Sequence, residues 1–201
     1  MPRQPVKRLW IRAVMMRGER RMAKRWGELP SSAGTFEVAL AEPADAEMVR
    51  TLLTEAAEWM RANGIAQWSP EQFTEELIAS YFAEREIFML LMENEPTGLF
   101  TLQKSDPDYW GPLNDEGFAY LHRLTVRPNF RGLSLGKEMI YWAAKHSRET
   151  GRKGLRFDCW DQNRKLNPYY RELGMEEKGI GTLNGRQYIL YEMNRELFQS
   201  L

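Results

Sequence analysis

The spacing of apolar positions changes along the chain between two periodicities. Residues 35–40 alternate apolar and polar side chains, which predicts a first strand. A helix is predicted to start at Pro43 and Asp45 and to end at Asn63–Gly64. Its apolar face consists of Val49, Leu52, Leu53, Ala56 and Met60. The same reasoning predicts helices over 70–84, 135–150 and 166–173, and strands over 87–92, 98–103, 118–126, 155–160 and 187–193.

The order of these elements predicts the class of fold. The early strands follow one another as hairpins, whereas the later strands alternate with helices, and a further strand is expected near 175–180. A polar loop spans 105–117, and Asn184–Gly185 is typical of a hairpin turn. The sequence therefore predicts a single α/β domain with a mixed sheet and helices on both faces.

Composition narrows the class of protein. The 201 residues are 43% hydrophobic, and 28 basic residues balance 28 acidic ones. Because affinity for nucleic-acid phosphates comes largely from a basic excess, a nucleic-acid partner is not expected. The single cysteine, Cys159, excludes an internal disulfide and fits a reducing cytoplasm. No apolar run approaches the roughly 18 residues of a spanning helix, so we expect a cytoplasmic protein without a membrane partner.

Residues 1–34 form a basic extension ahead of the predicted domain at 35–201. They contain nine basic residues against Glu19 and Glu28, and residues 29–34 have the composition of a linker. The basic residues are Arg3, Lys7, Arg8, Arg12, Arg17, Arg20, Arg21, Lys24 and Arg25. Three interpretations stay open: a poorly ordered tail, an upstream mis-start, and a targeting segment or nucleic-acid arm. Met15, Met16 and Met22 are alternative initiators.

The stretch LHRLTVRPNFRGLSLG, from Leu121 to Gly136, carries the strongest chemical signal. A predicted strand runs into Pro128, then into an Arg/Gly-rich turn and a long amphipathic helix. Such a turn directs backbone N–H groups at one point, and the helix adds the positive end of its dipole. Arg131 and Lys137 add charge. The segment therefore predicts a phosphate site, although the glycines alone would also suit a tight turn.

This segment resembles the acetyl-CoA-binding motif of the GNAT family of N-acetyltransferases, Arg/Gln-x-x-Gly-x-Gly/Ala. The resemblance implies that backbone amides hold the CoA pyrophosphate and that the preceding strand meets the acetyl group. It also implies a mixed, mostly antiparallel central sheet flanked by helices. Ser134 stands where the motif has its first glycine, which adds a Cβ and a hydroxyl at a closely approached position. The implied cofactor-binding residues are Leu124, Thr125, Val126, Arg131, Gly132, Leu133, Ser134, Leu135, Gly136 and Lys137.

A second segment, from Asp161 to Met175, is similar to the other motif of the family, Asn-x-x-Ala-x-x-Phe-Tyr-x-x-x-Gly-Phe. Asn163 and Tyr170 match it, whereas Leu166 and Met175 are apolar replacements. The resemblance implies that Asn163 contacts the pantetheine arm and that Tyr170 protonates the leaving thiolate. A phenol, with a pKa of about 10, stays protonated at neutral pH and can act as this acid. The alternative is that Tyr170 is a core aromatic.

His122 is the leading candidate for the general base. At pH 7 only about one in a few thousand alkylamines is neutral, so attack by the amine benefits from a base. The stretch YLHRLTVR is similar to HLHALAVH of arylalkylamine N-acetyltransferases, whose matching histidine serves proton removal. Strict alternation would place His122 and Leu124 on one face of the strand, and Arg123 on the other face. The resemblance to the family leads us to expect a bulge here, which would disturb this alternation. An ordinary strand histidine remains the alternative.

Other polar and aromatic residues are secondary candidates. Asp158 is a weaker base or an anchor for the amine, and Glu116 is weaker still. An aromatic wall suits an apolar or cationic amine, although the same residues could cap the core. The aromatic candidates are Trp59, Trp68, Tyr109 and Trp110. Cys159 is expected to be inert, and no His/Cys/Asp cluster has metal-ligand spacing, so no metal is expected.

These signals together predict an enzyme that moves an acetyl group from acetyl-CoA to a primary amine by direct transfer in a ternary complex. One alternative uses a longer acyl-CoA. Another is a non-catalytic acyl-CoA sensor, against which Asn163 and Tyr170 argue, because binding alone needs no leaving-group acid. A third, nucleic-acid binding, depends on the basic extension alone. The sequence leaves open which small-molecule or peptide amine is the acceptor, and whether the protein is a homodimer.

Overall fold

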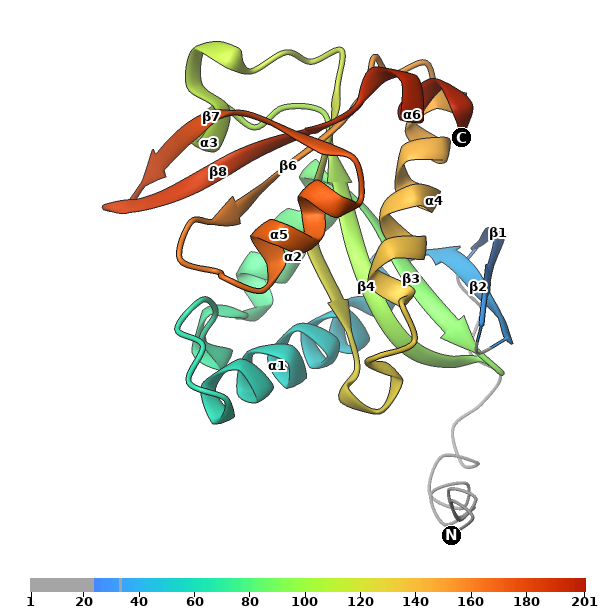
Figure 1. The fold of residues 1–201 in the computed structure, drawn as a ribbon. Coiled ribbons are helices and arrows are strands. Elements are labelled where there is room, and N and C mark those ends of the chain that lie inside the picture. Colours follow the sequence, from blue (N-terminus) through green and yellow to red (C-terminus); the bar gives the residue numbers. More distant parts are fainter. Residues whose placement is uncertain (1–23, 33) are drawn as a thin grey trace, which may run out of the picture.

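In the part of the chain that the structure describes, eight strands form one open sheet in the order β1-β2-β3-β4-β5-β6-β8-β7 (Figure 1). The structure is a computed structural model that describes residues 24–32 and 34–201. Within this part of the chain β5 and β6 pair in parallel and every other neighbouring pair is antiparallel, which confirms the mixed, mostly antiparallel sheet. The strands are β1 Lys24–Ser31, β2 Gly34–Leu40, β3 Glu86–Met92, β4 Glu95–Gln103, β5 Ala119–Val126, β6 Leu155–Trp160, β7 Met175–Leu183 and β8 Arg186–Met193.

The helices lie close to the positions that apolar spacing predicts. They are α1 Ala46–Ala62, α2 Glu75–Glu84, α3 Pro107–Trp110, α4 Leu135–Glu149, α5 Leu166–Glu172 and α6 Arg195–Ser200. The helix expected over 70–84 is split: a 3₁₀ turn at Pro70–Gln72 ends at Phe73, and Thr74 caps α2 by accepting the Leu77 N–H. Helices α3 and α6 were not predicted. Among the described residues, no helix has both the length and the apolar content of a membrane span.

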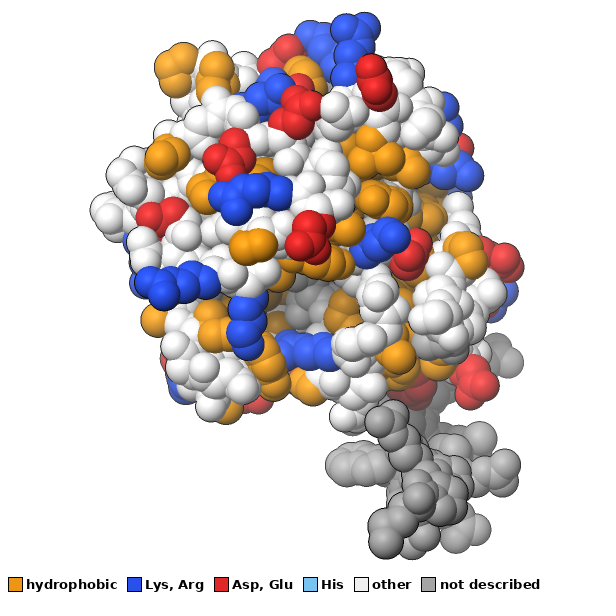
Figure 2. Space-filling view, viewed as in Figure 1, with side chains coloured by type: hydrophobic (Ala, Val, Ile, Leu, Met, Phe, Trp, Pro, Cys, Tyr) orange, Lys and Arg blue, Asp and Glu red, His pale blue; other side chains and the backbone are white. Residues whose placement is uncertain are grey.

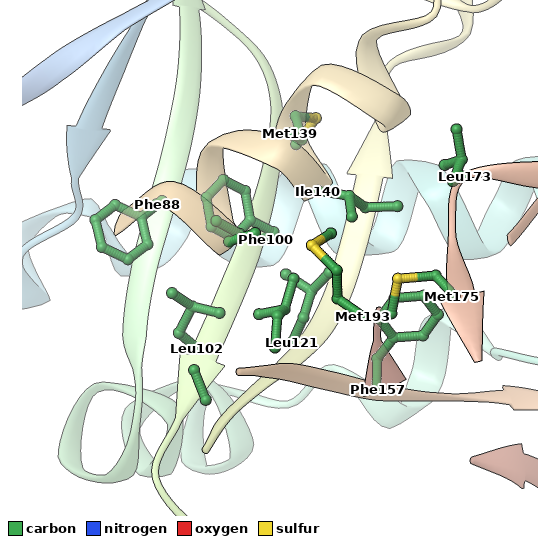
Figure 3. Close-up of a cluster of buried hydrophobic side chains, with 14 of the residues drawn as sticks. Phe88, Phe100, Leu102, Leu121, Met139, Ile140, Phe157, Leu173, Met175 and Met193 are labelled. Carbon is green, nitrogen blue, oxygen red and sulfur yellow. The ribbon is translucent and has the colours of Figure 1, made fainter. Parts of the chain in front are cut away.

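Helices cover both faces of the sheet. Helices α1 and α2 pack on one face, where Leu53 and Tyr81 meet Met89 of β3. Helix α4 packs on the other face, where Met139 and Ile140 meet aromatic side chains of β3 and β4 (Figure 3). Strands β3 and β4 are buried on both sides, which explains why 87–92 reads as a continuous apolar run rather than an alternating one.

The linker expected at 29–34 is wrong, because residues 29–31 belong to β1 and Gly34 begins β2. This strand pairs antiparallel with β2, and Leu29, opposite Phe36, is only 2% exposed. Pro30 and the neighbouring serines suggested a linker, but β1 is the edge strand, where a missing N–H is tolerated. Residues 1–23 lie outside the described part, so the interpretations of the basic extension remain predictions.

The hairpin and the extra strand predicted near the C-terminus are both present. Asn184 and Gly185 have φ values of 50° and 74°, the left-handed pair that a tight two-residue hairpin requires. They join β7 to β8, and the antiparallel register extends from Leu183↔Arg186 to Met175↔Met193.

Strands β5 and β6 separate after a short paired stretch. Only Ala119↔Leu155 and Tyr120↔Arg156 are paired, and Figure 1 shows the two strands diverging beyond them. The remainder of β5, from Leu121 onward, is paired with β4 on one side only. The sheet therefore opens at its centre, along the strand that carries His122.

A β-bulge interrupts β5 within the stretch that pairs with β4 but not with β6. Thr101 of β4 lies opposite His122, whereas Leu99 lies opposite Thr125, so two β5 residues face the single residue between them. Arg123 has a φ of 55°, and its side chain bonds to Tyr81 on the α2 face. Leu124 packs on the opposite face, in the core beneath α4. The bulge confirms the expected irregularity and overturns strict alternation: Arg123, not Leu124, shares a face with His122.

Candidate active site

A cleft of about 680 Å³ opens where β5 and β6 separate. It runs from the end of α1 and the start of α3 to α5, and the space-filling surface is hollowed between α1 and α5 (Figure 2). Residues from distant parts of the sequence meet in it. The polar and aromatic residues that line the cleft include Trp68, Arg85, Asp106, Tyr109, His122, Arg123, Asp158, Tyr170 and Tyr188.

His122 lies between two carboxylates in this cleft. Its Nε2 is 3.0 Å from Oδ2 of Asp106, and its Nδ1 is 3.6 Å from Oδ1 of Asp158. The His122 and Asp158 side chains are 13% and 11% exposed, and Asp106 is 5% exposed. Two flanking carboxylates orient the ring and stabilise the positive charge that it acquires when it takes a proton. The arrangement suits a general base that can reach the cleft.

The two carboxylates differ in origin and in environment. Asp158 comes from β6, and burial raises its pKa to about 6, with the Asp106 charge adding to the rise and the His122 charge opposing it. Asp106 precedes α3, and its backbone N–H donates to the Asn114 side chain. The charge of the cluster therefore changes near pH 6, which makes proton transfer there sensitive to pH.

Tyr170 of α5 lines the same cleft from the opposite side. Its ring packs against Phe157 and Tyr191 at centroid distances of 4.7 and 5.8 Å. Burial raises the pKa of its phenol, so the hydroxyl stays protonated at neutral pH. This environment suits a proton donor. Burial also raises the pKa of Cys159 to about 12, which leaves the thiol inert, as expected.

The Asp106, His122 and Asp158 cluster also has the spacing of a metal site. Their ligand atoms lie within 4.8 Å of one another, and among the described residues this is the one group of such side chains with that property. Sequence spacing could not reveal it, because the three residues come from separate elements. Both ring nitrogens face a carboxylate, and a neutral imidazole has a lone pair on only one nitrogen.

The predicted anion turn has its backbone amides unpaired. No hydrogen bond within the described chain uses the N–H groups from Leu133 to Gly136, and the first bond of α4 runs from Lys137 to the Ser134 carbonyl. Gly132 has a φ of 80°, which explains a glycine there. Ser134, the N-cap of α4, is also left-handed, with a φ of 57°. The serine thus occupies a backbone conformation that favours glycine. Replacing the first glycine of the motif by serine therefore places a side chain in the left-handed region.

The two charged side chains of this turn do not point at a common anion. Arg131 lies 3.4 Å from the centroid of the Trp59 ring and donates from Nε to the Val126 carbonyl. Lys137 lies 5.4 Å from the Tyr141 ring centroid. The turn therefore offers its amides to a ligand, whereas Arg131 is engaged in packing against α1.

Asn163 has a local structural role in addition to the one the resemblance implies. Its side-chain oxygen accepts the Leu166 N–H and so caps the start of α5, while no hydrogen bond is found for its amide nitrogen within the described chain. The neighbouring Asn167, which sequence reasoning missed, is buried and donates to the carbonyls of Trp160 and Asp161. These bonds fix α5, and with it Tyr170, against the end of β6.

The aromatic candidates divide into two groups. Trp68 and Tyr109 line the cleft, and the Tyr109 ring lies 6.0 Å from the His122 ring. Trp110, expected at the acceptor side, is instead a core residue: it is 2% exposed and packs against Tyr120 and Leu190. Trp59 stacks on Arg131 away from the cleft. Glu116 is exposed and does not line the cleft, so the structure leaves it no role as a base.

Sequence reasoning also missed three charged residues that line the cleft. Asp106 precedes a proline in a polar loop and reads as an ordinary turn residue. Arg85 follows α2 and reads as a solvated helix end. Arg123 was placed on the opposite face because the bulge reverses its direction. None of the three has a local signal: Arg85 and Asp106 reach His122 only through the tertiary fold, and the bulge alone turns Arg123 to the same face.

An opened sheet beside unpaired helix amides, with His122 and Tyr170 lining the same cleft, suits an enzyme that transfers acyl groups. The model of the acetyltransferase (GNAT) family matches residues 53–175, and the chain belongs to this family. The enzyme is an N-acetyltransferase.

Similarity to known proteins in sequence and in structure is consistent with this family. The chain is 29% identical to the Bacillus subtilis N-acetyltransferase YesJ over 141 residues, which cover 67% of this chain and 78% of YesJ. A GNAT acetyltransferase from Listeria monocytogenes superposes with a TM-score of 0.70 at 28% identity, covering 83% of this chain and all of that one. The aminoglycoside acetyltransferase AAC(6')-Ib, solved with coenzyme A and kanamycin, shares the fold at a TM-score of 0.65 and 16% identity, over 82% and 98% of the two chains.

Replacing Ser134 tests the strain at the helix N-terminus. Ser134→Gly and Ser134→Ala both remove the hydroxyl, but only glycine relieves the left-handed backbone conformation. We expect S134G to exceed S134A in free energy of unfolding by about 1 kcal/mol, measured by urea denaturation. Equal stabilities would show that the turn stores no strain.

The raised pKa of Asp158 predicts an inverted pH dependence of stability. The folded state binds this proton more tightly than the unfolded chain, so the contribution of the group is present at low pH and is lost as pH rises through about 6. The unfolding free energy of wild type minus that of Asp158→Asn should fall by about 2 kcal/mol between about pH 4.5 and pH 7. His122, Asp106 and Arg123 remain in both proteins. A difference that is constant or grows with pH contradicts the assignment.

Proposed function

We propose that the protein transfers an acetyl group directly from acetyl-CoA to a primary amine within a ternary complex. The observation that carries the proposal is the position of His122, between Asp106 and Asp158, in the same cleft that Tyr170 lines. A base and an acid on the two sides of one cleft can serve the attacking amine and the leaving thiolate in a single encounter.

The residues present fit acetyl-CoA. The unpaired amides from Leu133 to Gly136 would hold its pyrophosphate at the positive end of α4. The open side of β5 from Leu121 onward offers backbone groups to the pantetheine arm, and Asn163 lies on the segment that joins β6 to α5. When bound, acetyl-CoA supplies an activated acetyl thioester. Backbone amides near Leu124 and Val126 would stabilise charge on the acetyl oxygen.

His122 prepares the acceptor for attack. It takes a proton from the ammonium form of the acceptor, directly or through one water, so that the nitrogen lone pair can form the new C–N bond. Asp106 and Asp158 hold the ring and balance its acquired charge. At pH 7 forming the neutral amine costs roughly 4–5 kcal/mol for an amine of ordinary basicity, and a positioned base provides the path for that proton.

Tyr170 completes the transfer. As the C–S bond breaks, its hydroxyl donates a proton to the sulfur, so that CoA leaves as the thiol. The nitrogen of the new C–N bond gives up its second proton, which returns through solvent to the Tyr170 oxygen. A phenol of ordinary pKa, about 10, is protonated at neutral pH, and burial raises the pKa of Tyr170 further. A longer acyl-CoA would follow the same steps, and a non-catalytic sensor would use neither His122 nor Tyr170.

Removing the Tyr170 hydroxyl should slow the reaction without weakening cofactor binding. With acetyl-CoA and a panel of primary amines, we expect Tyr170→Phe to lower kcat by about 100-fold, measured by release of free thiol. The acetyl-CoA Kd should change by less than about 2-fold, because the ring remains. Tyr169→Phe, its neighbour on α5, is the matched control and should stay close to wild type. If Y170F turned over like Y169F, Tyr170 would not be the acid; tight CoA binding without turnover on any amine would support the sensor.

Replacing the base should make activity depend on the ionisation of the acceptor. His122→Gln is expected to lower kcat/KM by about 100-fold at pH 7, with part of the loss recovered at pH 9, where more amine is neutral. A chelator should leave the wild-type rate unchanged. A wild-type rate that fell with EDTA and returned with a divalent cation would instead assign Asp106, His122 and Asp158 to a metal.

A further inference from the structure

We infer that the acceptor amine also carries an oxyanion, a carboxylate or a phosphate, which Arg85 and Arg123 bind. The inference rests on the proposed function, because it assigns the other end of the acceptor whose amine faces His122. Both arginines line the cleft that contains the Asp106, His122 and Asp158 cluster.

Arg85 has polar atoms with no partner. Its Nε and Nη1 are inaccessible to solvent and form no hydrogen bond, while its guanidinium lies 4.3 Å from the centroid of the Tyr81 ring. Burial is the main cause that lowers its pKa; the Arg123 charge acts in the same direction, whereas Tyr81, Asp106 and Glu84 oppose it. A guanidinium with buried, unpaired N–H groups is costly, and an oxyanion is the group that best satisfies its planar donors.

Arg123 is held beside it by aromatic side chains. Its Nε donates to the Tyr81 hydroxyl at 2.9 Å, and its guanidinium lies 5.4 Å from the Trp68 ring centroid. The strained backbone of the bulge, with a φ of 55°, turns this side chain into the cleft. Tyr81 therefore contacts both arginines, so their spacing is set by one buried residue.

The two arginines lack the carboxylate partners that several other arginines of the protein have. Five described arginines meet carboxylates directly: Arg25, Arg61, Arg127, Arg156 and Arg171 all form ion pairs. No such ion pair forms for Arg85 or Arg123 among the described residues. Two like charges side by side repel each other unless an anion lies between them. Their own packing against Tyr81 does not remove that cost.

The cleft thus presents charges of both signs. Asp106 and Asp158 suit an ammonium near His122, whereas Arg85 and Arg123 suit an anion near α2. A polycation would meet two unpaired guanidinium groups and is disfavoured. A zwitterionic acceptor such as an amino acid or an aminoalkyl phosphate complements both ends, with Trp68 and Tyr109 against its apolar part.

Matched acceptors test this inference in the full-length protein. Glycine, β-alanine and 4-aminobutanoate are compared with their carboxamides, and 2-aminoethyl phosphate with 2-aminoethanol. We expect the best acid to exceed its amide in kcat/KM by about 10- to 100-fold, the range for a charge-assisted contact. The phosphate pair then decides which oxyanion is preferred. The number of carbon atoms between the amine and the carboxylate of the best acid indicates the spacing between the arginines and His122.

Variants connect the preference to the arginines. Arg85→Gln and Arg123→Gln should reduce the acid-to-amide ratio towards one, and Arg85→Lys should give an intermediate ratio because it keeps the charge but loses the fork. Arg195→Gln, which removes an exposed charge on α6, should leave the ratio unchanged. Thermal melting identifies any variant that fails to fold. The acid-to-amide ratio of kcat/KM in the wild-type protein tests the inference without any variant.

A binding measurement separates this inference from the proposed function. In the presence of CoA, the acids but not the amides should raise the melting temperature of wild type, and R85Q and R123Q should lose the effect. Acid binding that depends on the arginines, without turnover of any amine, would contradict the proposed function and keep the oxyanion site. Acids and amides that behave alike in both rate and binding would overturn the inference.

Discussion

The loss of pairing between β5 and β6 is the constraint on which the rest of the site depends. Two parallel strands that stay paired would bury the backbone of β5 and leave no room at the centre of the sheet. Because pairing ends at Tyr120↔Arg156, the remainder of β5 keeps one edge open inside the protein. Open backbone groups in a sheet centre need a partner, and an extended acyl-CoA arm can provide one. The family's cofactor site is thus a consequence of how far two strands remain in register.

The bulge in β5 determines which side chains meet in that opening. One extra residue opposite Phe100 sends Arg123 to the same face as His122 and Leu124 to the core beneath α4. A regular strand would have placed Arg123 away from the cleft. The strained φ of Arg123 is held in place by Tyr81 and by pairing with β4 on both sides of the bulge. The local strain is thereby connected to the proposed recognition of the acceptor.

Burial sets the chemistry of the groups that the fold gathers. The same desolvation that raises the pKa of Tyr170 and keeps its proton also raises the pKa of Asp158 to about 6. It also makes an unpaired guanidinium at Arg85 costly. One physical effect therefore underlies the proposed proton donor, the pH-sensitive carboxylate and the proposed anion site. The three side chains differ in which form, charged or neutral, the proposed role requires.

The sequence by itself determined the elements, the anion turn and the Asn163/Tyr170 segment, because periodicity, turn residues and motif spacing are local properties. It could not place Asp106 or Arg85 near His122, since they lie on separate elements and carry no local signal. It also misassigned 29–34, where serines and a proline proved to be an edge strand, and Trp110, whose burial depends on β5 and β8. Sequence thus determined the proposed cofactor side of the cleft, which is a continuous strand–turn–helix. Only the tertiary structure decided the proposed acceptor side, because its residues come from segments that are distant in the sequence.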